Sequence, residues 1–290
     1  MPLPHAAFLS RAAKSAAVVL LAAFSASGAS AQITDRVDSS LLESWRLSTG
    51  NLIRFCQYES SPTFEFDQAV GQAIADSLLV SAEFTPLGDA YGIGGEYAIE
   101  DLFVSLTNDC DIMLGMGLAA GLYPVEFTTT RAYVGLPYVL AVADPEFEAL
   151  TDIPGDRRIG ALVGSYGFSA VMRYRATLPE NQRWQPLPYG DTDLMMTRLF
   201  DETIAGMVVY GPSLVEYLNE NTIEGEIFVH PLETQIAANV NIGGIMLARN
   251  SYLRTLVDEA IGFMAEDGTI EALLAEHGYE TLAAAPGGYQ

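Results

Sequence analysis

The chain has 290 residues and a formal net charge of −23 at pH 7, from 37 acidic and 14 basic side chains. Such an acidic surface repels phosphate backbones and anionic lipid, so the charge argues against nucleic acid or a membrane surface as a partner. The acidic residues are dispersed rather than grouped at the spacing of a cation site, and we interpret them as a solubility feature. The sequence predicts no metal site and no cofactor.

The first 31 residues have the pattern of a secretory signal peptide. Arg11 and Lys14 give a positive start, a short apolar run follows over Ala16–Phe24, and Ala29-Ser30-Ala31 is a small-x-small cleavage site. The run is too short to span a bilayer as a stable helix. We therefore expect cleavage after Ala31, with a retained N-terminal anchor as the alternative and no other membrane insertion.

Strand-like and helix-like segments alternate along the rest of the chain, which predicts an α/β fold with parallel strands and right-handed crossovers. We expect strands over 53–56, 82–85, 112–115, 133–143, 159–163, 206–210 and 242–248, and a loop over 91–95. We expect helices over 66–78, 99–106, 194–200 and 252–264, and helices that begin after 164, at 211 and at 269. Asp67 lies in the first turn of its helix, where a negative charge suits the helix dipole, and Thr269 is the expected N-cap of the last helix.

The sequence contains two cysteines, Cys56 and Cys110. In an oxidising compartment an even pair favours a disulfide. Two buried thiols are the alternative, because the bond requires Cα atoms within about 7 Å of each other.

Several catalytic classes are disfavoured. Lys14 is the only lysine, so cleavage would leave no Schiff-base amine and no phosphate-binding lysine. The sequence has no H-E-x-x-H and no G-x-S-x-G motif, and His230 and His277 have no zinc-ligand spacing. Carboxylates alone can still perform acid–base chemistry, and Glu59 with Asp191 is the pair to test. We nevertheless expect no enzyme activity.

The stretch Gly164-Ser165-Tyr166-Gly167 joins an expected strand to an expected helix. A turn of this kind directs backbone N–H groups of the helix start at one spot, where an anionic group can bind. Its spacing is not G-x-G-x-x-G, so dinucleotide binding is disfavoured. An ordinary strand-to-helix turn that needs glycine for a positive φ is an equally good interpretation of the local sequence.

Five motifs resemble, in order, those of the bacterial periplasmic solute-binding proteins of family 3. They are Phe66-Asp67, Cys110–Met116, Val125–Thr128 with Arg131–Tyr133, Val163–Gly167, and Asp267–Ile270. The resemblance covers nearly all of the chain after the signal peptide. It implies a two-lobed clamshell of type 2, in which each lobe is a mostly parallel sheet flanked by helices. Lobe 1 would comprise 32–137 plus 238–290, and lobe 2 would comprise 138–237.

The resemblance also implies a function. Proteins of this family are periplasmic, bind a small ligand in the cleft between the lobes without catalysis, and deliver it to an ABC permease. We expect a monomer. The candidate ligand-binding residues are Gln57, Tyr58, Glu59, Met116, Gly117, Arg131, Ser165, Tyr166, Gly167, Asp191 and Tyr210.

Two departures from the family pattern bear on the ligand. Amino-acid binders have an arginine where this chain has Gly121 and an aspartate near the position of Tyr210. Without these partners the charges of an α-amino acid would be buried unmatched, so we expect ordinary α-amino acids to bind poorly. Structural roles remain open for Arg131 as an ion pair, for the tyrosines as packing residues, and for Asp191 as the start of a helix.

A subgroup associated with quinoprotein methanol dehydrogenases is similar at Cys56, Cys110-Asp111 and Thr130–Tyr133. The chain departs from this subgroup directly after Cys56. Membership would imply a different function, that of an accessory protein that contacts a periplasmic quinoprotein dehydrogenase.

Overall fold

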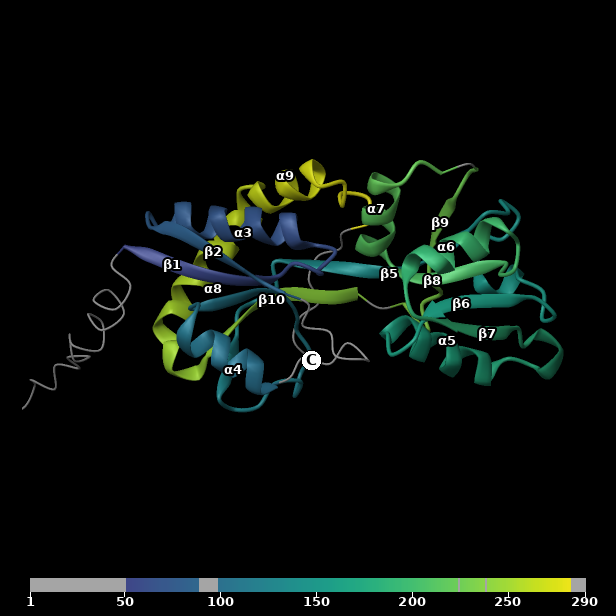
Figure 1. Cartoon of the computed structure of the whole chain (residues 1–290), viewed down its shortest axis with the longest axis horizontal. Coiled ribbons are helices and arrows are strands. Elements are labelled where there is room, and N and C mark those ends of the chain that lie inside the picture. Colours follow the sequence, from purple (N-terminus) through teal and green to yellow (C-terminus); the bar gives the residue numbers. More distant parts are fainter. Residues whose placement is uncertain (1–50, 89–98, 224, 238, 283–290) are drawn as a thin grey trace, which may run out of the picture. The chain divides into compact units, whose positions relative to one another are not determined.

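The computed structural model describes residues 51–88, 99–223, 225–237 and 239–282 (Figure 1). The expected signal peptide and the expected loop at 91–95 lie outside these residues. The first elements alternate strand and helix as predicted. They are β1 (Leu52–Tyr58), α3 (Phe64–Ser77), β2 (Ser81–Leu87), α4 (Ile99–Asn108), β3 (Ile112–Gly117), β4 (Phe127–Thr129) and β5 (Val134–Val142).

The alternation continues in the second half of the chain, which ends in two helices. The elements are β6 (Arg158–Leu162), α5 (Tyr166–Thr177), β7 (Gln185–Tyr189), α6 (Thr192–Phe200), β8 (Gly206–Tyr210), α7 (Gly211–Glu220), β9 (Phe228–Pro231), β10 (Asn239–Leu247), α8 (Ser251–Glu266) and α9 (Thr269–Glu276). Short 3₁₀ helices lie at Leu150–Asp152, Glu180–Gln182 and Ala248–Asn250.

The described strands pair in the order β2-β1-β3-β10-β5-β8-β6-β7, with β4 against β10 and β9 against β5. Strands β1, β2 and β3 are parallel, and so are β6, β7 and β8. Strands β5 and β10 are antiparallel to the strands that they pair with. The predicted α/β class is confirmed.

Strand β5 connects two parts of the sheet. Its residues Val134–Pro137 pair with β10, whereas Tyr138–Val142 pair with β8 and β9. We call β1–β4, β10 and the helices α3, α4, α8 and α9 the β1–β3 part, and we call β6–β9 and the helices α5, α6 and α7 the β6–β8 part. The change of partner falls between Pro137 and Tyr138, where the sequence analysis divides the lobes, although the lobe boundaries stay a prediction.

Two strands and one helix cap differ from the sequence-based expectations. Strands β4 and β7 were not expected. Pro186 and Pro188 interrupt β7, which is tolerated because β7 lies at the end of the strand order and pairs on one side, with β6. The N-cap of α9 is Gly268, with φ +85°, rather than Thr269, whose hydroxyl donates to Asp267 Oδ1 at 2.6 Å.

Candidate functional site

The carboxyl ends of β6, β7 and β8 bring three helix starts to one edge, which we call the β6–β8 edge. Ser165 is the N-cap of α5, Asp191 is the N-cap of α6, and Tyr210 precedes the first residue of α7. These strands are parallel, so their carboxyl ends lie at the same side of the sheet, where open α/β folds bind ligands. The topology therefore brings the candidate residues of the second half together.

The turn before α5 is held by Ser165. Its Oγ accepts a hydrogen bond from the Phe168 N–H at 3.0 Å and donates to the Leu162 carbonyl at 2.7 Å. Gly164 has φ +76°, as an ordinary strand-to-helix turn requires. Helix geometry leaves the N–H groups of Tyr166 and Gly167 without an intrahelical carbonyl, so the same turn can also direct them at an anionic group.

Three tyrosine rings meet at this edge. The Tyr138 ring centroid lies 5.8 Å from that of Tyr166 and 5.4 Å from that of Tyr210. Gly167 makes this possible, because a Cβ at that position would lie 2.8 Å from the Tyr138 ring. The Arg173 guanidinium lies 5.4 Å from the Tyr166 centroid, and Tyr166 remains 43% exposed. The edge thus presents an aromatic surface with one cation beside it.

The candidates from the β1–β3 part are mostly internal. Gln57, Tyr58 and Met116 are buried, and the Gln57 amide donates to the Phe64 carbonyl at 3.3 Å. The half-buried Gly117 accepts a hydrogen bond from the Tyr123 hydroxyl at 2.9 Å through its carbonyl. Glu59, directly after β1, is exposed.

Asp191 makes the contact that its structural interpretation predicts, whereas Arg131 contacts Asp258 of α8 through its backbone N–H and not through the expected side-chain ion pair. The Arg131 N–H donates to Asp258 Oδ1 at 2.6 Å, and its guanidinium packs against Gly262, so both groups face α8. The Asp191 carboxylate accepts from the Leu194 N–H at 2.7 Å and caps α6. A ligand role for either residue stays a prediction.

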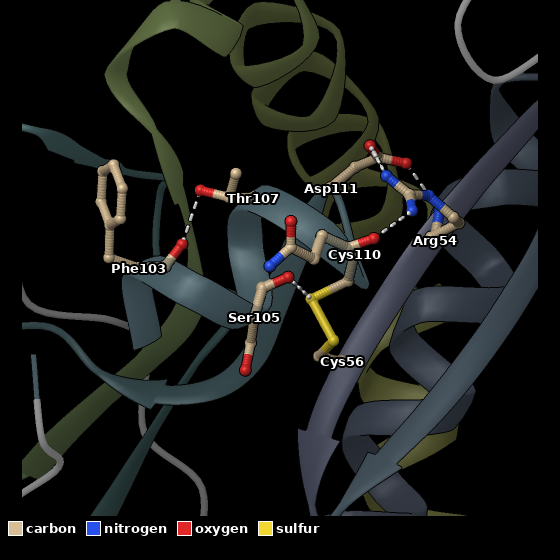
Figure 2. The surroundings of a disulfide bond; sticks show 8 residues. Arg54, Cys56, Phe103, Ser105, Thr107, Cys110 and Asp111 are labelled. Carbon is tan, nitrogen blue, oxygen red and sulfur yellow. Dashed lines mark hydrogen bonds and ion pairs between the residues drawn. A yellow bond between two sulfur atoms is a disulfide. The ribbon is translucent and has the colours of Figure 1, made fainter. Parts of the chain in front are cut away.

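The two cysteines form a disulfide, as expected, with their Cα atoms 5.6 Å apart (Figure 2). The bond joins β1 to the residues that lead into β3. Figure 2 also shows Arg54 beside it, whose guanidinium donates to Asp111 Oδ1 at 3.0 Å and to the Asn108 carbonyl at 3.1 Å. Two neighbouring strands that are distant in sequence, β1 and β3, are therefore cross-linked by a disulfide and by an ion pair.

Sequence analysis missed a buried carboxyl, Asp67, in the first turn of α3. The Thr63 and Tyr133 hydroxyls each donate to it at 2.6 Å, and Tyr133 in turn accepts from the Gly115 N–H at 3.0 Å. Burial raises the pKa of Asp67 to about 7, against the lowering effect of the two hydrogen bonds. A signal was available, since Asp67 shares the helix face of Val70 and Ile74 at i+3 and i+7.

Tyr133 extends this cluster toward the β6–β8 edge. Burial raises the pKa of Tyr133 well above its ordinary value, and the charges of Asp67 and, more weakly, Tyr210 add to the effect. Tyr210 is thus near both the buried Asp67–Tyr133 pair and the half-buried Tyr138 ring.

A recess of about 340 Å³ lies elsewhere, between the end of β5 and the segments that precede β6 and β8. Asp144, Phe147, Arg157 and Glu202 line it. No candidate residue contributes to it, and it lies at the amino ends of β6 and β8, so we do not assign the function there. Across the described ranges, no group of three or more His, Cys, Asp or Glu side chains is placed to hold a metal ion.

Within the part of the chain that the structure describes, no helix has both the length and the apolar character needed to cross a bilayer. Neither a protein-family model nor a curated protein sequence matches the chain.

Solved structures do match the fold. Substrate-binding domain 2 of GlnP from Lactococcus lactis, in an open conformation, aligns with TM-score 0.62 at 13% identity, covering 78% of this chain and 95% of that domain. The amino acid ABC transporter substrate-binding protein AbpA from Streptococcus pneumoniae, bound to L-arginine, aligns with TM-score 0.51 at 15% identity, covering 80% and 96%. An ancestral amino-acid-binding protein, AncCDT-1, described as a precursor of cyclohexadienyl dehydratase, aligns with TM-score 0.53 at 15% identity, covering 82% and 98%.

At these identities the likeness shows the fold. The chain has the two-lobed fold of periplasmic binding proteins, as the resemblance implied. Several of the similar structures are described as amino-acid-binding or amino acid ABC transporter substrate-binding proteins.

Proposed function

We propose that the protein is a periplasmic solute-binding protein that captures a small ligand and delivers it to an ABC-type permease. The observation that carries the proposal is the shared fold, which covers almost the full length of the solved substrate-binding proteins. The β6–β8 edge supports it, because the exposed Tyr166 ring with the half-buried rings beside it and the capped helix starts provide contacts for a small molecule.

The ligand, in this proposal, is not an ordinary α-amino acid. Three of the similar structures are described with arginine or glutamine bound. Here Gly121 is an exposed glycine with φ +73° and offers no guanidinium, and Tyr210 offers a phenol instead of a carboxylate. A ligand with an apolar or aromatic body and at most one negative charge fits the tyrosines, Arg173 and the start of α5 better than a zwitterion does.

Binding without catalysis also belongs to the proposal. Of the carboxylate pair considered for acid–base chemistry, Asp191 is engaged in capping α6. The hydrogen bond that it accepts from the Leu194 N–H ties this carboxylate to a structural task.

A thermal-shift screen of amino acids, organic acids, aromatic compounds, sugars and polyamines tests the proposal. A ligand at 100 times its Kd stabilises the folded state by about 2.7 kcal/mol. We expect a hit to stabilise the parent and Tyr252→Ala but not Tyr166→Ala. Tyr252 is the matched control, since it is 45% exposed on α8 and Tyr166 is 43% exposed.

Micromolar binding of a common α-amino acid would overturn the proposed ligand class. If no small molecule stabilises the protein but a purified quinoprotein dehydrogenase does, the accessory role replaces the transport role.

A further inference from the structure

The short segment after α9, Gly278–Leu282, touches both parts of the sheet, and we call it the C-terminal strap. It leaves α9 at Gly278, which has φ +75°, and leads toward α7 (Figure 1). The Leu282 N–H donates to the Tyr279 carbonyl at 3.0 Å, so the segment is a defined turn.

Tyr279 fastens the strap to the β1–β3 part. It is 6% exposed, and its ring packs edge-on against Phe66 of α3 with centroids 5.7 Å apart. Its hydroxyl donates to the Pro62 carbonyl at 2.8 Å, just before α3, and its N–H donates to the Leu274 carbonyl of α9 at 2.8 Å. A buried ring with a satisfied hydroxyl makes this end of the strap a fixed point.

Leu282 fastens the other end to the β6–β8 part. It packs on the apolar cluster that contains Met207 and Val209 of β8 and Leu214 of α7. Its Cδ1 lies 3.1 Å from where a Cβ on Gly211 would be, so the glycine that opens α7 leaves the room that Leu282 fills. At the start of the strap, Gly278 faces Val215 of α7.

The electrostatics agree with this bridging position. Burial foremost, and then the carboxylates of Asp67, Glu216 and Glu65, raise the pKa of Tyr279 to about 12. Asp67 and Glu65 belong to α3, whereas Glu216 belongs to α7. The Tyr279 hydroxyl is therefore near charged groups from both parts at once.

The chain itself passes between the two parts along β5, at Pro137 and Tyr138, and returns ahead of β10. We propose that the C-terminal strap is a further, non-covalent connection that limits how far the β6–β8 part can rotate relative to the β1–β3 part. Leu282 would be its releasable contact and Tyr279 its anchor. In a hinged protein a few residues absorb the backbone rotation between the two moving parts. A packed contact outside those residues therefore restricts the rotation. The proposal does not depend on which ligand binds.

The test measures the distance between the two parts directly. Spin labels attached through unnatural amino acids at Ser77 and Glu180 leave the disulfide intact, and both positions are exposed. For Leu282→Ala we expect a distance distribution roughly twofold wider than that of the parent, because the packed end of the strap is lost. Glu280→Ala, an exposed position within the strap, should leave the distribution unchanged.

A chain that ends at Thr281 serves as a second variant and should widen the distribution as Leu282→Ala does. Leu282→Met, which conserves most of the volume, should restore the parental width. Circular dichroism checks that each variant is folded. Parental widths in both folded Leu282→Ala and the shortened chain would overturn the proposal.

Discussion

The two parts of the sheet use their polar residues differently. In the β1–β3 part, polar groups are cross-links: the Cys56–Cys110 disulfide, the Arg54–Asp111 ion pair and the buried Asp67–Tyr133 hydrogen bond. At the β6–β8 edge, Ser165 and Asp191 cap helices at the surface. The first arrangement fixes a frame, whereas the second leaves side chains in contact with solvent, where a ligand can reach them.

The difference explains why candidate residues that look alike in the sequence differ in their exposure to solvent. Tyr58 is the last residue of β1 and is 7% exposed, whereas Tyr166 begins a helix and is 43% exposed. A residue at the end of a strand is buried or presented depending on what packs over it. If the comparison is right, changes in the frame should cost stability, and changes at the edge should cost little stability.

The largest effect is expected from the buried carboxyl and should depend on pH. Burial raises the pKa of Asp67 from 3.8 to about 7. Between these values the folded state keeps a proton that the unfolded state releases, so stability falls as pH rises from about 4 to about 7. A pKa shift of about three units corresponds to a change of about 4 kcal/mol in the free energy of unfolding. Asp67→Asn should lose this dependence, measured by urea unfolding at pH 4.5 and 7.5.

Asp76→Asn is the matched control, because Asp76 lies on the same helix but is exposed, and its carboxylate accepts a hydrogen bond from the Gln72 amide at 2.8 Å. It should retain the parental pH dependence. An unchanged slope in Asp67→Asn would mean that the carboxyl is ionised in the folded state throughout this range, and the frame would then contain a buried charge.

The disulfide should give the next effect. Cys56 and Cys110 are 54 residues apart in sequence. In the chain-entropy model, closing a loop of this length stabilises the fold by about 4 kcal/mol, an upper value when the reduced chain keeps residual structure. Cys56→Ala with Cys110→Ala should lower the free energy of unfolding by that order. Reduced parent protein is the control, since it loses the bond but keeps both sulfurs; a loss under about 1 kcal/mol in both samples would contradict the cross-linking role.

Much of the fold was predictable because burial imposes a period on the sequence. The apolar stripe of α3 and the short apolar runs of β3 and β8 indicate helix and strand directly. Strand β7 was missed because Pro186 and Pro188 break the pattern that a paired strand shows, and only its place in the strand order explains why they are tolerated.

The site was predictable where topology alone determines position. Parallel strands end at one edge, so Ser165, Asp191 and Tyr210 follow from the strand assignments. Their role with a ligand stays a prediction. Tyr138 and Arg173 were missed because their ring contacts depend on how β5 pairs with β8, and no local sequence pattern predicts that pairing. The sequence analysis interpreted Asp67 as a charge that stabilises the helix dipole, whereas the side chain is buried and bonded to Tyr133. An aspartate in the first turn of a helix is compatible with both roles, so its position in the sequence does not separate them.

The smallest effect is expected at the helix starts of the edge, and it separates capping from ligand contact. Ser165→Ala removes the acceptor for the Phe168 N–H and should cost about 1 kcal/mol, whereas Ser165→Gly should cost only a few tenths. Ser169→Ala, exposed on the same helix, is the control. Urea unfolding gives the stability and a thermal-shift titration with the screening hit gives the affinity. If Ser165 only caps α5, affinity follows stability, and Ser165→Gly binds like the parent. If Ser165→Gly is stable yet binds at least about tenfold more weakly, a loss of 1.4 kcal/mol, then the hydroxyl contacts the ligand as well.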